Sequence, residues 1–143
     1  MKAVAIKSLD RFLTAQNGKY EIALSEIRAG KKTSHWMWFI FPQAKGLGKS
    51  DMAKYYGIEN LDEAKLYLAD EILRKGLLEI SEALLTITHN DPAIIMGYPD
   101  NLKLQSSMTL FSLADPSCRV FQAILDKFYN GEQDAATRKL VIG

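Results

Sequence analysis

The sequence feature that most constrains the fold is a run of apolar residues at helical spacing between positions 73 and 87. Their spacing is four, three, four and three residues, through Leu73, Leu77, Ile80, Leu84 and Ile87. An α-helix repeats about every 3.6 residues, so this spacing places all five side chains on one stripe. A second such stripe comprises Val120, Phe121, Ile124, Leu125 and Phe128. The two patterns predict amphipathic helices that pack their apolar faces into a common core.

Start and stop signals divide the remaining chain into further helices. Small polar residues that cap a helix N-terminus precede several apolar segments, and Gly or Asn-Gly follows them. Ser8, Ser50, Asn60, Asp115 and Asp134 are the expected caps. We found no internal repeat and no long linker. The sequence therefore predicts an all-α fold, with residues 1–143 forming a single compact domain of about seven or eight helices. The expected ranges are 8–16, 20–29, 50–56, 60–68, 73–87, 99–113, 116–129 and 134–141.

Residues 34–41, with the sequence SHWMWFIF, are ambiguous. Trp, Phe and Ile favour strands, and a short apolar run cannot be assigned by periodicity. A single strand without a partner would not make a sheet, however. Ser34 is a suitable cap and Pro42 closes the segment. We therefore interpret it as a buried helix.

Composition excludes several classes of protein. The 143 residues are 48% hydrophobic, enough for a sizeable core, and the net charge of +1 argues against a dedicated nucleic-acid binder. One cysteine, Cys118, cannot form an intramolecular disulfide. The longest apolar run, from Trp36 to Phe41, is too short to span a membrane, and Ala3–Ile6 is too short for a signal-peptide core. We therefore expect a cytoplasmic protein with no membrane association.

The segment Gly46-Leu47-Gly48-Lys49-Ser50 ends like a phosphate-binding P-loop. A P-loop needs another glycine where this chain has Gln43, and no strand that ends in a magnesium-binding Asp follows. The sequence therefore argues against a P-loop ATPase. Gly46, Gly48 and Lys49 remain candidate ligand-binding residues, because a glycine-rich loop before a helix can expose backbone N–H groups to an anion. The alternative is a flexible loop capped by Ser50.

The segment 34–43 also carries candidate chemistry. His35 beside two tryptophans is a candidate general base, and therefore the candidate catalytic residue. Ser34 and Gln43 could supply hydrogen bonds to a ligand, and Trp36 or Trp38 an aromatic wall. The alternative is that His35 is a core histidine bonded to a carbonyl. His35 and His89 are the only two histidines and neither has a zinc-type partner at helical spacing, so we expect no metal site.

Residues 99–111 place Lys103, Ser106 and Ser107 on one arc of a predicted helix. A lysine followed by two hydroxyls one turn later can hold a phosphate or a carboxylate. A lysine-assisted serine nucleophile would normally show the opposite order, Ser-x-x-Lys. The alternatives are a solvated polar face and an ion pair of Lys103 with Asp100. We expect the 34–43 segment to face Lys103–Ser107, with 46–50 at the rim.

With these motifs the chain resembles an uncharacterised family, domain of unknown function 1810. The resemblance runs from about Arg11 to Leu140, and its most specific motifs are SHWMWFIFPQ and LKLQSSMTLF. It implies an all-helical fold and no established activity. Family members are often called calpastatin, a long disordered inhibitor built from repeats, and we reject that name for a chain with a full core. A looser resemblance to helical N-glycosidases and ADP-ribose-processing domains carries over no catalytic residue.

These features favour a small-molecule site over other functions. The leading hypothesis is a domain that binds, and could hydrolyse, an anionic nucleotide-like ligand such as ADP-ribose or an N-glycoside, without a cofactor. The aromatic, cationic and hydroxyl side chains of the two segments are the kinds that line ligand pockets. The alternative hypothesis is a non-catalytic protein-interaction module in which the same residues are structural.

Overall fold

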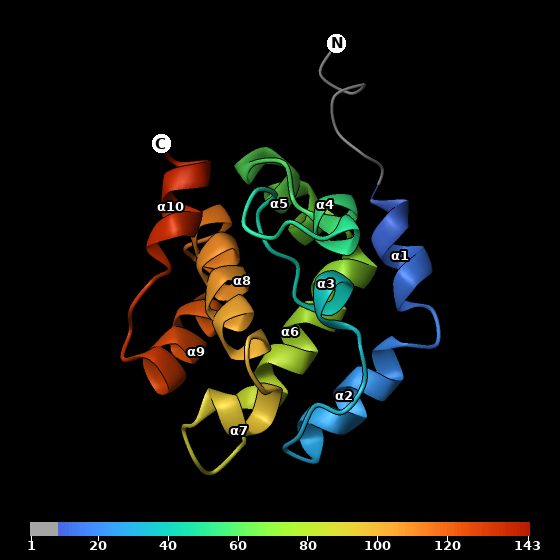
Figure 1. Ribbon diagram of the computed structural model, residues 1–143, viewed down its shortest axis with the longest axis vertical. Helices are drawn as coiled ribbons and strands as arrows, with labels where there is room; N and C mark the ends of the chain where they lie inside the picture. The colour runs from blue at the N-terminus through green and yellow to red at the C-terminus, as the bar shows by residue number, and fades with distance from the viewer. Residues whose placement is uncertain (1–8) are drawn as a thin grey trace.

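The helices of the computed structural model, which describes residues 9–143, surround two long central helices (Figure 1). The described part of the chain contains no strand, only an isolated parallel bridge between Ala44 and Ile58. The all-α fold predicted from the sequence is confirmed, with more and shorter helices than expected. Within residues 9–143 there are ten: α1 (Asp10–Gln16), α2 (Tyr20–Arg28), α3 (Met37–Ile40), α4 (Asp51–Tyr56), α5 (Leu61–Ala69), α6 (Glu71–Leu85), α7 (Pro92–Met96), α8 (Asp100–Ala114), α9 (Arg119–Tyr129) and α10 (Ala135–Val141).

The central helices are α6 and α8. The predicted stripe of α6 is buried at Leu73, Leu77, Ile80 and Leu84, and the helix packs against α2, α5 and α9. Helix α8 is buried around most of its circumference, because α5, α7, α9 and α10 all pack against it (Figure 1). The N-terminal half of α8 carries Lys103. The helices packed around α8 therefore determine which other segments can lie close to Lys103.

Several predicted helix ends are confirmed. Ser50, Asn60 and Asp134 each accept a backbone N–H bond in the first turn of the following helix. The α9 helix ends at Asn130, whose φ of 55° is left-handed, and Gly131 follows. The predicted cap Ser8 lies outside the described residues. None of the helices described is long and apolar enough to cross a membrane.

Other predicted ends were wrong. Helix α9 does not begin at Pro116, because the Asp115 carboxylate accepts bonds from the N–H and hydroxyl of Ser117 and closes a turn instead. Helix α6 stops at Leu85, two residues before Ile87. Helix α7 was not predicted, although Asp91 caps it and Pro92 occupies its first turn.

The 34–41 segment is helical over only one turn, α3, in place of the whole helix that we predicted. Ser34 caps nothing: its hydroxyl and its N–H both bind the carboxylate of Glu26, from α2. These bonds hold the chain away from helical geometry until Trp36. The aromatic part of the segment is nevertheless buried, at Trp36, Phe39 and Phe41.

A buried ion pair fixes α1 to the α4–α5 region. The guanidinium of Arg11 lies 3.1 Å from the Glu63 carboxylate, and both side chains are almost fully buried. The same guanidinium donates to the backbone oxygens of Tyr55 and Gly57. The other carboxylate oxygen of Glu63 accepts the N–H of Glu59. Helix α1 is thereby attached to the segment that precedes α5.

Candidate functional site

Two lysines from distant parts of the sequence share one carboxylate. Lys32 Nζ lies 2.9 Å from Oδ2 of Asp100, and Lys103 Nζ lies 3.5 Å from Oδ1. Lys32 also donates to the backbone oxygen of Ser34, at 2.6 Å, and its side chain is 8% exposed. Lys103 has no closer acceptor in the described chain and its side chain is 30% exposed. Lys32 is thus a satisfied structural cation, whereas Lys103 keeps donors available to solvent.

Each lysine also lies over a tryptophan ring. The ammonium of Lys32 is 5.0 Å from the centre of the Trp36 ring, and that of Lys103 is 5.8 Å from the centre of the Trp38 ring. Both distances are in the range of cation–π attraction. The structure therefore brings Trp38, from the 34–43 segment, next to Lys103 of α8. The pairing of Lys103 with Asp100, weighed above as an alternative to ligand binding, is also present.

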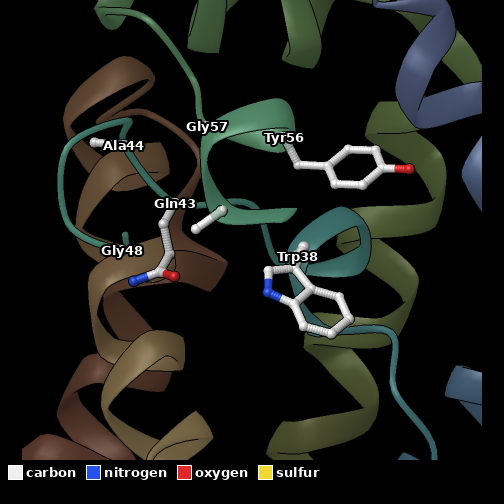
Figure 2. A pocket seen from close by; sticks show the side chains of 7 residues that line it. Trp38, Gln43, Ala44, Gly48, Tyr56 and Gly57 are labelled. Atoms are coloured by element: carbon white, nitrogen blue, oxygen red, sulfur yellow. The ribbon is translucent and has the colours of Figure 1, made fainter. Parts of the chain in front are cut away.

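Trp38 lines a small recess between the 43–48 loop and α4. Its cavity volume is about 10 Å³, room for about one water molecule, and Figure 2 shows the Gln43 amide and the nitrogen-bearing edge of the Trp38 indole facing the same gap. Neither group has a hydrogen-bond partner among the described residues. The recess thus combines an aromatic wall with two unpaired polar groups. Its lining comprises Trp38, Gln43, Ala44, Gly48, Ala53, Tyr56 and Gly57.

Two glycines allow the recess walls to approach one another. A Cβ atom on Gly57 would lie 2.7 Å from Cβ and 2.8 Å from Cα of Lys45. A Cβ atom on Gly48 would lie 2.6 Å from the Cβ of Ala53. Such contacts are too short for any side chain, so both positions require glycine on steric grounds. Gly48, predicted as a phosphate-binding glycine, also has this packing role.

His35 lies in a different recess. It is exposed, and it lines a depression of about 360 Å³ with Ser34, Trp36, Lys19, Ile22 and Thr33. None of these residues lines the Trp38 recess. His35 forms no hydrogen bond with the described chain, so no carboxylate or carbonyl orients its imidazole.

The polar groups beside His35 are occupied by Glu26. Its carboxylate accepts the N–H groups of Thr33 and Ser34, the hydroxyl of Ser34 and the indole N–H of Trp36. Partial burial opposes ionisation, but these hydrogen bonds lower the pKa of Glu26 to about 2. Such a weak base cannot deprotonate the Ser34 hydroxyl at neutral pH. Glu26 therefore organises residues 33–36 and does not activate Ser34.

The remaining predicted residues are dispersed. Ser106 bonds to Asp134 and to the backbone oxygen of Leu102, away from Trp38. Ser107 is fully buried and its hydroxyl has no hydrogen-bond partner within residues 9–143. Gly46 packs toward Leu140 of α10, and Lys49 is exposed on the loop.

A wider groove lies between α1, α2 and α6, and some of its polar groups are already paired. The Tyr20 hydroxyl lies within bonding distance of the Gly76 oxygen and the Glu79 carboxylate. The amide of Gln16 donates to the Phe39 oxygen and to the Tyr67 hydroxyl. The groove is also lined by the exposed polar side chains of Asn17, Glu21 and Lys75. No cluster of three or more metal-ligating side chains occurs within residues 9–143.

Sequence reasoning missed Lys32 and Glu26. Lys32 precedes the aromatic segment by a few residues, but nothing in the spacing indicates that it meets Asp100, 68 positions later (100 − 32). Glu26 looks like an ordinary surface residue of an amphipathic helix. Only the turn that returns residues 33–36 to α2 reveals its role.

Comparison with known proteins places this architecture in one family. A search of curated proteins found no match. Among solved structures, the chain is similar to the conserved hypothetical protein Rv1873 from Mycobacterium tuberculosis, with 43% sequence identity and a TM-score of 0.92. The match covers 94% of this chain and 96% of that one. Because the family model "Protein of unknown function (DUF1810)" also matches residues 6–141, the chain belongs to that family.

Proposed function

We propose that this protein binds a small, anionic, nucleotide-like ligand at the Trp38 recess, with the anionic group on Lys103. The observation that carries the proposal is the state of Lys103. Its ammonium lies over Trp38 but has only a distant carboxylate partner, at 3.5 Å. Beside it, the recess presents the unpaired amide of Gln43. Apolar walls with a few convergent polar groups are typical of ligand sites.

The charges around Lys103 support an anionic ligand held at the mouth of the recess. Lys32, Asp100 and Lys103 together carry two positive charges and one negative charge. Lys32 is neutralised by the closer carboxylate oxygen, which leaves the excess charge on Lys103. The cavity volume of about 10 Å³ is far below the roughly 300–1,000 Å³ of a ligand pocket. The ligand would therefore lie at the mouth of the recess, with its anionic group against Lys103.

Binding is better supported than hydrolysis. His35, the candidate catalytic residue, lines another recess and has no orienting partner in the described structure. A general base must lie within hydrogen-bond reach of the proton that it removes. We keep His35 as the residue to test for hydrolysis, and ADP-ribose and N-glycosides as members of the ligand class.

The experiment is a titration of the wild-type protein with AMP, ADP-ribose and ribose 5-phosphate by thermal shift and calorimetry. A ligand that binds the folded state alone raises Tm. Lys103→Met, which retains an unbranched apolar side chain over Trp38, should lose this shift. Lys139→Met, at an exposed lysine of α10, is the matched control and should retain it.

Two results would count against the proposal. One is the absence of binding by all three compounds, which would favour the interaction-module alternative. The other is equal binding by Lys103→Met and wild type. Chromatography of the same mixtures detects hydrolysis, and a product formed by wild type but not by His35→Ala would establish a catalytic role for His35.

A further inference from the structure

We propose that the groove between α1, α2 and α6 is a second binding site, for a small aliphatic amine whose ammonium group is held by the carboxylates of Glu21 and Glu79. None of the residues that line this groove lines the Trp38 recess, and none takes part in the ion pairs around Lys103. The inference therefore goes beyond the anion site proposed above and does not depend on it. It assigns the protein an additional ligand of the opposite charge.

The groove has the size and the apolar surface of a ligand site. Its cavity volume is about 900 Å³, within the roughly 300–1,000 Å³ of ligand pockets. One wall is a single face of α6, which carries Ile72, Lys75, Gly76 and Glu79 at helical spacing. The end of α1 and the start of α2 form the other wall. Because Ile72 is 68% exposed, a hydrocarbon chain that covers it would remove apolar surface from water.

The ring of Tyr20, which lines the groove, is fixed against α6. Its hydroxyl donates to the Glu79 carboxylate at 2.6 Å and lies 2.9 Å from the backbone oxygen of Gly76. A Cβ atom on Gly76 would lie 3.1 Å from Cε1 of the ring. Glycine inside a helix is less stable than alanine, but here it lets the ring lie close to the α6 backbone. The groove therefore contains an immobilised aromatic ring, a group that attracts cations.

Negative charge dominates the surroundings of Tyr20. Two carboxylates, of Glu21 and Glu79, line the groove together with one cation, Lys75. Burial raises the pKa of Tyr20 most, and the charges of Glu79 and Glu21 raise it further. Arg28, which lies 3.8 Å from Glu79 outside the groove lining, lowers this pKa, but by less than either carboxylate raises it. The local field therefore favours a positively charged ligand.

An aliphatic amine matches both the field and the apolar wall. Its ammonium group can bind the carboxylates and the Tyr20 ring, while its hydrocarbon chain covers Leu13 and Ile72. Lys75 distinguishes this ligand from an anion or a zwitterion, because its ammonium repels an amine and attracts a carboxylate. Removal of the Lys75 charge should therefore strengthen amine binding, whereas removal of a groove carboxylate should weaken it.

The test is an NMR titration of the isotope-labelled full chain with hexylammonium chloride, hexan-1-ol and sodium hexanoate, which share a chain length and differ in charge. Hexylammonium should shift the amide signals of α1, α2 and α6 and should bind about tenfold more tightly than the other two. Glu21→Gln should weaken its binding about threefold, and Lys75→Met should strengthen it by about the same factor. The matched control is Glu132→Gln, at an exposed glutamate between α9 and α10, which should leave the affinity unchanged.

Several results would refute the proposal. One is the absence of hexylammonium binding, or amide shifts that lie outside α1, α2 and α6. Equal affinity for hexan-1-ol or hexanoate would refute recognition of the positive charge. Weaker binding by Lys75→Met, or equal losses in Glu21→Gln and Glu132→Gln, would refute the placement of the ammonium group. Because Glu21, Lys75 and Glu132 are all exposed, the variants should fold, and the spectrum of each variant without ligand verifies this.

Discussion

Replacement of Arg11 by Met should be among the most destabilising single changes in this protein. The substitution removes a guanidinium that is 3% exposed, and leaves the carboxylate of Glu63, which is 0% exposed, without its ion pair. The oxygens of Tyr55 and Gly57 also lose their donors. Breaking a buried pair by removing one partner costs about 3–5 kcal/mol. For a domain of this size, that corresponds to a decrease in Tm of roughly 10 °C or more.

The assay is equilibrium unfolding in urea, in which a lower midpoint with an unchanged m-value reports lost stability. Arg28→Met is the matched control, because Arg28 pairs with Glu79 at 3.8 Å with side chains 61% and 42% exposed. Such exposed pairs contribute about 0–1 kcal/mol. If Arg11→Met lowers the free energy of unfolding no more than Arg28→Met does, the buried ion pair does not stabilise the fold.

Two further predictions concern buried polar groups. Ser107→Ala should leave the free energy of unfolding unchanged or raise it by about 1 kcal/mol, because the hydroxyl is buried without a partner among the described residues. Ser106→Ala should lower the free energy of unfolding by about 1 kcal/mol, because the bond to Asp134 is lost. Equal urea midpoints for the two variants would contradict this. Glu26, with a folded-state pKa lowered to about 2, should contribute stability above its unfolded pKa of about 4.3, and this contribution should be lost as the pH falls toward about 2. The stability difference between wild type and Glu26→Gln should therefore shrink between about pH 7 and about pH 3, and a constant difference would refute the assignment.

The helices that dominate the core were predictable because burial imposes a period on the sequence. The α6 stripe from Leu73 to Leu84 and the α9 stripe from Phe121 to Phe128 are buried as the spacing predicts. The caps Asn60 and Asp134 were also predictable, since capping depends on bonds within one turn. Apolar periodicity and helix capping both depend on residues within a few positions of each other, so the sequence alone reveals them.

Helix boundaries failed where a local signal had more than one solution. Asp91-Pro92 and Asp115-Pro116 are the same dipeptide, yet only the first begins a helix. Two residues after Asp115 comes Ser117, whose N–H and hydroxyl both donate to the carboxylate and close a turn. Two residues after Asp91 comes Ala93, which has no hydroxyl and donates only its N–H to the carboxylate, within the first turn of α7.

The candidate site was only partly predictable for a similar reason. Trp38 and Lys103 meet, as expected from their aromatic and cationic character, but the expected neighbour His35 lies in another recess. The displacement follows from Glu26, which binds residues 33, 34 and 36 and stops the helix from extending back to Ser34. The hydrogen bonds between Glu26 and residues 33–36 produce no hydrophobic periodicity, so the sequence pattern could not reveal them.

Helix α8 illustrates how hydroxyl residues can serve as spacers. The hydroxyls of Ser106, Thr109 and Ser112 each reach a carbonyl oxygen of the preceding turn, on Leu102, Gln105 and Thr109. Their small side chains are thus satisfied largely within the helix and can lie in the interior. Bulkier residues at these positions would push neighbouring helices apart, because interiors are close-packed. Four helices can therefore pack around α8 because these side chains are small. From the sequence alone, the same hydroxyl residues suggest chemistry and not spacing.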